Sequence, residues 1–98
     1  MSRPVKLRRQ AKKEINEAVD WYEQRLAGLG GQFRFHVQEV LDRISASPEI
    51  HSVVYKDIRC TLLRRFPYAV YYRVKRDRIV VIAVFHSSRD PREWQSRA

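Results

Sequence analysis

The sequence predicts an α+β domain in which a hairpin of two helices packs against one face of a β-sheet. Between residues 10 and 46 apolar side chains recur every three or four positions, which is the period of an amphipathic helix. From residue 53 onward the period changes to two, which is typical of strands with one buried face. The expected order is an N-terminal strand, two helices, a three-stranded antiparallel meander that completes one sheet, and a short C-terminal helix.

The first strand and the helical hairpin are expected in the N-terminal half. Residues 5–8 alternate apolar and charged side chains, which is typical of a short strand. The apolar positions predict one helix over about 10–27 and a second over about 32–46. The second helix is expected to end before Pro48, because proline disfavours helical geometry in the residue before it. All three glycines lie within 28–31, so we expect a tight reversal there.

Three antiparallel strands are expected in the second half. Residues 58–62 and 70–75 alternate apolar and polar side chains, so we expect neighbouring strands with one wet, basic face. The strand expected over 78–85 is apolar at every position from 79 on, which predicts a central strand covered on both faces. Asp90 can cap the amides of a final short helix, with Glu93 in the reciprocal position. The helices are expected on one sheet face, and the other face is expected to be basic, aromatic and open.

Length and composition limit the function. The chain has 98 residues, which predicts a single domain over 1–98. It carries 20 Lys and Arg against 11 Asp and Glu, a net charge of +9, which favours nucleic acid, a ribosome or an acidic protein as partner. Cys60 is the only cysteine and no apolar stretch of signal-peptide length follows the basic start, so the cytoplasm is expected. The longest apolar run, 79–85, is too short to cross a membrane.

Motifs for metal or cofactor binding are missing from the sequence. The three histidines, His36, His51 and His86, are scattered, and no cysteine or carboxylate stands at ligand spacing from them. The glycines are confined to the helix turn, so no glycine-rich phosphate loop is formed. We therefore expect neither a metal nor a cofactor.

Three stretches and the order of the elements carry a resemblance. Residues 64–74 are RRFPYAVYYRV, residues 86–94 are HSSRDPREW, and residues 11–23 are AKKEINEAVDWYE. Together they resemble the RelE/ParE toxin superfamily of type II toxin–antitoxin systems, also described as plasmid stabilisation proteins, over almost the whole chain. The resemblance implies the RelE/ParE-like fold and a toxin that is neutralised by a cognate antitoxin in a hetero-oligomer.

The two branches of this superfamily imply different activities. RelE-like members cut messenger RNA on the ribosome without a metal, and they place an arginine directly after the tyrosine that opens the third strand. That position here is Ala69, and the lysine-rich stretch of the preceding strand is also absent. The arginine after the last strand does match, at Arg89. ParE-like members, whose known representatives poison DNA gyrase by binding it, lack the same catalytic groups, so the chain resembles this branch more closely.

The basic residues give the candidate site. Four arginines are candidates for contact with the target or with nucleic acid: Arg59, Arg65, Arg73 and Arg89. In the alternative, a ribosome-dependent endoribonuclease, Arg59, His86 and Arg89 are the candidate catalytic residues. A basic RNA-binding relative without toxicity is a third alternative. His86 also has a structural interpretation, in which it caps the sheet edge by bonding Asp90 or a backbone carbonyl.

Two aromatic residues are candidates for antitoxin binding. Trp21 falls on the flank of the first helix, and Phe35 lies opposite the apolar stripe of the second. The charge of +9 favours an acidic antitoxin, and a hairpin beside a free sheet edge offers it a groove and a strand to pair with. We expect this antitoxin segment to be disordered alone and to fold when it binds.

Overall fold

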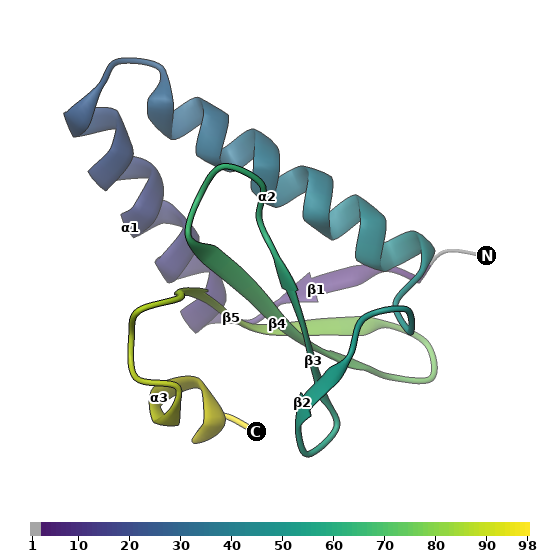
Figure 1. Cartoon of the computed structure of the whole chain (residues 1–98). Helices are drawn as coiled ribbons and strands as arrows, with labels where there is room; N and C mark the ends of the chain where they lie inside the picture. The colour runs from purple at the N-terminus through teal and green to yellow at the C-terminus, as the bar shows by residue number, and fades with distance from the viewer. Residues whose placement is uncertain (1–2) are drawn as a thin grey trace.

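A computed structural model describes residues 3–98. Its elements, in order, are β1 (Val5–Leu7), α1 (Arg9–Arg25), α2 (Leu29–Ala46), β2 (Val53–Tyr55), β3 (Ile58–Leu62), β4 (Tyr68–Val74), β5 (Ile79–His86) and α3 (Arg92–Gln95). The strands form one sheet in the order β1-β5-β4-β3-β2, in which only β1 pairs in parallel (Figure 1). The predicted α+β class and element order are confirmed. The short edge strand β2 adds a fifth strand that the periodicity did not separate from β3.

The helical hairpin covers one face of the sheet (Figure 1). Phe33, Val40 and Ile44 of α2 are fully buried there, together with Val70 and Tyr72 of β4. Each such side chain contributes about 1.5–3 kcal/mol by leaving water. The apolar residues that recur every three or four positions in the sequence are therefore the ones that face this core. Among the described residues, no helix is long and apolar enough to span a membrane.

The turn between the helices is shorter than the glycines predicted. Only Gly28 has a left-handed backbone, with φ of 91°, whereas Gly30 and Gly31 lie inside α2, which begins at Leu29. The carboxylate of Glu23 accepts the amides of Gly28 and Gly30 at 2.8 and 3.0 Å, so it satisfies donors that the start of α2 leaves free. A side chain at Gly30 would lie 2.6 Å from the carbonyl of Val19, so this glycine permits the close approach of α1 and α2.

Strand β5 lies inside the sheet, between β1 and β4, as its apolar sequence predicted. Its register against β4 steps from Tyr71–Ala83 to Tyr72–Val81, so Ile82 is an extra residue and forms a bulge. Ile82 and Ala83 consequently belong to the same cluster on the face away from the hairpin. The bulge also changes which backbone groups of β5 point toward β1.

An ion pair takes the place of a strand beside the second half of β5. Strand β1 ends at Leu7, and beyond it the amide of Val84 donates to Glu14 Oε1 at 3.0 Å. Arg97 Nη1 donates to the carbonyl of Ile82 at 3.2 Å and to the same Glu14 oxygen at 3.1 Å, and Nη2 donates to Oε2 at 2.7 Å. A neighbouring strand would supply one acceptor and one donor at these two positions. Glu14 and Arg97 supply them from side chains.

The second sheet face is partly closed, which corrects the expectation that it would be open. Helix α3 places Trp94 over it, with only 4% of this residue exposed. Trp94 stacks on Tyr71 at 4.1 Å between ring centroids and meets Tyr55 edge-on. Aromatic residues that the sequence left facing solvent are thus packed together, because α3 folds back over the sheet.

Helix α3 begins largely as the sequence predicted. The carboxylate of Asp90 accepts the amide of Arg92 at 2.9 Å. Glu93 does not reach back to complete a reciprocal cap, as had been expected, and instead forms an ion pair with Arg89 at 2.7 Å. An arginine one helical turn away competes successfully for this carboxylate.

Candidate functional site

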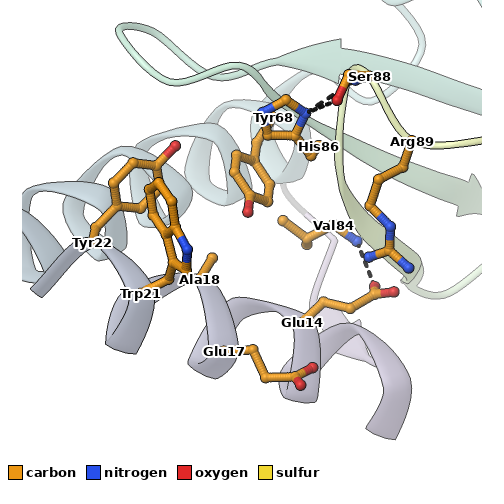
Figure 2. A pocket seen from close by; sticks show the side chains of 10 residues that line it. All are labelled: Glu14, Glu17, Ala18, Trp21, Tyr22, Tyr68, Val84, His86, Ser88 and Arg89. Carbon is orange, nitrogen blue, oxygen red and sulfur yellow. Dashed lines mark hydrogen bonds between the residues drawn. The ribbon is translucent and has the colours of Figure 1, made fainter. Parts of the chain in front are cut away.

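The candidate site is a groove between α1 and the C-terminal end of β5 (Figure 2). Its volume is about 420 Å³. It is lined by ten residues of α1, of the start of β4, of β5 and of the loop that follows: Glu14, Glu17, Ala18, Trp21, Tyr22, Tyr68, Val84, His86, Ser88 and Arg89. From the sequence, Trp21 was a candidate for antitoxin binding, Arg89 a candidate for target binding, and His86 a candidate catalytic residue of the ribonuclease alternative. The fold brings all three into one groove.

His86 is held at the end of β5 by the loop that follows it. Its Nδ1 accepts the amide of Ser88 at 3.0 Å and lies 2.7 Å from the Ser88 hydroxyl. Its ring also meets Tyr68 edge-on at 5.2 Å. Among residues 3–98 the hydrogen-bond partner of the His86 ring is Ser88, and the expected bond to Asp90 or to a backbone carbonyl is not formed. Because Nδ1 accepts an N–H, the ring proton belongs on Nε2, which leaves this nitrogen as a hydrogen-bond donor.

Arg89 forms the charged rim of the groove. Its guanidinium lies 4.1 Å from the centre of the Phe85 ring and bonds Glu93 at 2.7 Å. Both members of this ion pair are about half exposed, at 47% and 51%, so water screens the pair and a ligand can reach Arg89. Arg89 is thus a positive charge with a fixed position.

The aromatic wall of the groove comes from Trp21, Tyr22 and Tyr68 (Figure 2). Trp21 is 50% exposed, and Arg25 lies over its ring at 4.0 Å. Burial raises the pKa of Tyr22 and Tyr68, so both remain neutral phenols at pH 7. Neither tyrosine was selected as a site residue from the sequence. For Tyr22 the only signal was its place beside Trp21, because its position in the helical stripe assigned it to the core.

Two of the predicted arginines lie elsewhere and are already bonded. Arg59 of β3 stands directly opposite Tyr72 of β4, so its side chain lies on the same sheet face as Tyr72, the face covered by the helical hairpin. There Nη1 donates to the carbonyls of His51 and Glu49 at 2.6 and 3.1 Å. Arg73 is on the other face and bonds Asp57 at 2.7 Å, which lowers the pKa of that carboxyl. The expectation of one basic sheet face holding both arginines is therefore wrong. The register of β3 on β4, in which Arg59 faces Tyr72 and Arg73 faces Ile58, places the two side chains on opposite faces.

Ala69, the position at which RelE-like relatives carry an arginine, is packed inside the protein. It is 1% exposed and pairs with Phe85 across β4 and β5. The neighbouring Tyr72 is fully buried, and its hydroxyl donates to the carbonyl of Pro48 at 2.6 Å. Burial raises the pKa of Tyr72 to about 12. Neither position offers a group to a ligand.

Arg65 and Phe35 lie at a second hollow, of about 610 Å³, between the start of α2 and the β3–β4 loop. Arg64, which the sequence analysis did not select, lines it as well. Trp21 and Phe35 therefore belong to different hollows, although both are exposed as expected. Across residues 3–98 no three His, Cys, Asp or Glu side chains gather closely enough to hold a metal ion.

Comparison with known proteins agrees with this fold. A solved structure titled "Chromosomal ParDE TA system from P. aeruginosa" has a similar fold: it superposes with a TM-score of 0.65 at 16% sequence identity, covering 87% of this chain and 96% of that chain. No curated protein matches the sequence. Residues 5–91 match the family described as ParE toxin of type II toxin-antitoxin system, parDE. The chain belongs to this family of toxins.

Proposed function

We propose that this ParE-family toxin stops growth by binding a large cytoplasmic target, with DNA gyrase first among the candidates, and that it does not cut RNA. The observation that carries this proposal is the composition of the groove. Besides His86 it holds one arginine, Arg89, and two carboxylates, Glu14 and Glu17. Such a mixture suits recognition of a protein surface, with an apolar wall and a few polar groups at its rim.

Metal-free cleavage of RNA would need a general base, a general acid and cations around one phosphate. Among the described residues, the nitrogen of His86 that could accept a proton is occupied by Ser88. Arg59 and Arg73 are bonded at other places in the sheet. These features support binding as the mode of action.

We further propose that an acidic antitoxin neutralises the toxin by occupying the same groove. Trp21, Tyr22 and Tyr68 offer an apolar wall for an amphipathic segment, and His86 Nε2 and Arg89 offer donors for its carboxylates. The net charge of +9 steers such a segment toward the surface. Antitoxin and target then compete for His86 and Arg89, which explains neutralisation by occlusion.

Purified protein tests the target directly. We expect it to inhibit supercoiling of relaxed plasmid by gyrase, or to trap cleaved DNA, and we expect antitoxin to relieve this effect. Translation extracts assayed in parallel should show intact messenger RNA. Cleavage of ribosome-bound messenger RNA at preferred codon positions, with supercoiling unaffected, would refute the proposal and assign the chain to the ribonuclease branch.

A further inference from the structure

The second hollow differs from the groove in its charge. It is formed by the N-terminal end of α2 and the β3–β4 loop, and its lining residues are Gly28, Gly31, Gln32, Phe35, His36, Arg64 and Arg65. Among the described residues its lining holds no carboxylate, whereas the groove is lined by Glu17 and by Glu14, of which Glu14 is paired with Arg97. The two hollows therefore attract different ligands.

The two arginines at this hollow are free to bind a ligand. Within residues 3–98, the side chains of Arg64 and Arg65 form no ion pair and no hydrogen bond, and both residues are exposed. Most other arginines near the sheet are bonded to carboxylates or carbonyls, as Arg59 and Arg73 are. Two adjacent unpaired guanidinium groups present donors suited to phosphate oxygens.

The backbone of Arg65 is left-handed in the loop that carries its side chain to the hollow. Its φ is 67°, in the left-handed region where glycine is the unstrained residue. An L-residue with a Cβ costs about 1–2 kcal/mol there. Such positions occur in tight turns, as at Lys56 with φ of 51°, and they also cluster at ligand sites.

Phe35 adds a flat apolar surface beside these charges. Phe35 is 65% exposed, which is more than the 50% of Trp21, the other exposed aromatic side chain in the described part of the chain. The space over Gly31 is open, since a Cβ built there meets no atom within 4 Å. A planar ring can therefore approach Phe35 from the hollow.

We propose that this hollow binds single-stranded nucleic acid, with backbone phosphates on Arg64 and Arg65 and an unpaired base stacked on Phe35. Cationic grooves with aromatic platforms bind single strands in this way, and stacking requires a base that is not paired. An acidic peptide is the alternative ligand: its carboxylates would bind the arginines, but they would not stack on Phe35. The proposal goes beyond the proposed function, because it holds whether or not gyrase is the target.

The first test uses a short fluorescein-labelled single-stranded DNA oligonucleotide and measures its affinity at several salt concentrations. The double variant R64A/R65A should bind on the order of 10-fold or more weakly, and the slope of log K against log salt should fall by about 1.4, since each phosphate contact on a single strand contributes about 0.7. The matched control is K75A/R76A, which removes two exposed charges from the β4–β5 turn at the other end of the sheet. Equal losses in both double variants would overturn the proposal.

The second test separates stacking from apolar contact. Phe35→Ala should weaken binding on the order of 10-fold, because stacking of a base on an aromatic ring contributes about 1–3 kcal/mol. Phe35→Leu keeps a large apolar side chain but has no aromatic face, so it should bind almost as weakly. Full binding by Phe35→Leu, or no loss in Phe35→Ala, would refute the stacking contact.

The third test asks whether the ligand is a peptide. A poly-glutamate peptide should displace the oligonucleotide only at much higher concentration, and its own binding should not respond to Phe35→Ala. Displacement at equal concentration would instead identify the hollow as a site for acidic protein. Arg65→Gly provides a folding control: it should weaken oligonucleotide binding without lowering the melting temperature, because glycine relieves the left-handed strain at this position.

Discussion

Glu14 of α1 and Arg97 beyond α3 stand 83 residues apart, yet their side chains together complete the hydrogen bonding of β5. Glu14 accepts the amide of Val84, and Arg97 donates to the carbonyl of Ile82. The side chains are only 6% and 18% exposed, so water does not replace these bonds if one partner is lost. The pair joins the first helix, the central strand and the C-terminal segment at one point.

Removing Arg97 should therefore be costly. Arg97→Ala leaves the Glu14 carboxylate buried without a counterion, and we expect unfolding in urea to show a loss of about 3 kcal/mol. The double variant E14A/R97A should lose less than the sum of the two single variants, because the unpaired charge is gone. Arg92→Ala, which removes an exposed ion pair in α3, should change stability little. Strictly additive losses would show that the pair is not coupled.

The two helical glycines should respond in opposite ways to the same substitution. Gly31→Ala should stabilise the protein by about 0.5–1 kcal/mol, because the space is open and alanine favours a helix. Gly30→Ala should destabilise it by about 1–3 kcal/mol, because the new Cβ would lie 2.6 Å from the carbonyl of Val19 and would force the helices apart. Thermal unfolding of both variants measures this. A stable Gly30→Ala variant would contradict the packing of α1 on α2.

His51 should make the protein less stable as the pH falls. Burial, and then the charges of Arg43 and Arg59, lower the pKa of His51 below its ordinary value of 6.5. The unfolded chain therefore takes up a proton at a higher pH than the folded protein does. The contribution to stability is complete above pH 6.5 and is lost as the pH falls through the unfolded and then the folded pKa.

Stability measured in urea at pH 7.5 and at pH 5.5 checks this sign, and His51→Gln is the matched variant because it cannot titrate. The difference in stability between the two pH values should be smaller in His51→Gln than in the natural sequence. Equal differences would mean that His51 does not contribute.

In the groove, Arg89 should matter more for toxicity than His86. Arg89 carries a permanent charge at the rim, and its loss should weaken target binding roughly 10-fold or more. His86→Ala should have a smaller effect, because its Nδ1 is already used by Ser88. Growth inhibition on induction gives the ranking, and Glu93→Gln is the control that removes the partner of Arg89 but keeps the guanidinium. Loss of toxicity only in the folded His86 variant would reverse this order.

Trp21 should be an anchor for the antitoxin. Trp21→Ala should weaken antitoxin binding by about 2 kcal/mol, which is typical of a buried aromatic anchor. Leu26→Ala is the control, because Leu26 is 62% exposed at the end of the same helix and does not line the groove. Circular dichroism should show the antitoxin segment gaining structure as it binds. A segment that is fully folded when free, or binding insensitive to both salt and Trp21→Ala, would refute this prediction.

Several features of the fold followed from local patterns. The apolar stripe that includes Ile15 predicted a helix whose ends lie within two residues of the observed ends of α1. The prediction succeeded because the residues of this stripe are the ones that α1 buries in the core. The apolar run of β5 predicted a central strand for the same reason. Asp90 marked the start of α3, because capping is a local interaction of a side chain with amides two residues away.

The candidate site was only partly predictable. Trp21, His86 and Arg89 were each selected, but nothing in the sequence indicates that α1 passes beside the end of β5. Arg59 and Arg73 were grouped as one basic face, although they lie on opposite faces of the sheet. Which groups meet in space depends on strand register, and β3 pairs with β4 so that Arg59 lies beside Tyr72 and Arg73 lies beside Ile58.

The sequence by itself determined the class of fold, the order of the elements and the toxin superfamily, because periodicity, caps and ordered motifs are local properties of the chain. Only the tertiary structure decided that Glu14 and Arg97 replace a strand, that Trp94 closes the second face, and that Arg64, Arg65 and Phe35 share a hollow. These contacts join residues far apart in the chain, so their free energy depends on packing and on backbone direction at a distance. A local sequence pattern therefore does not predict such contacts.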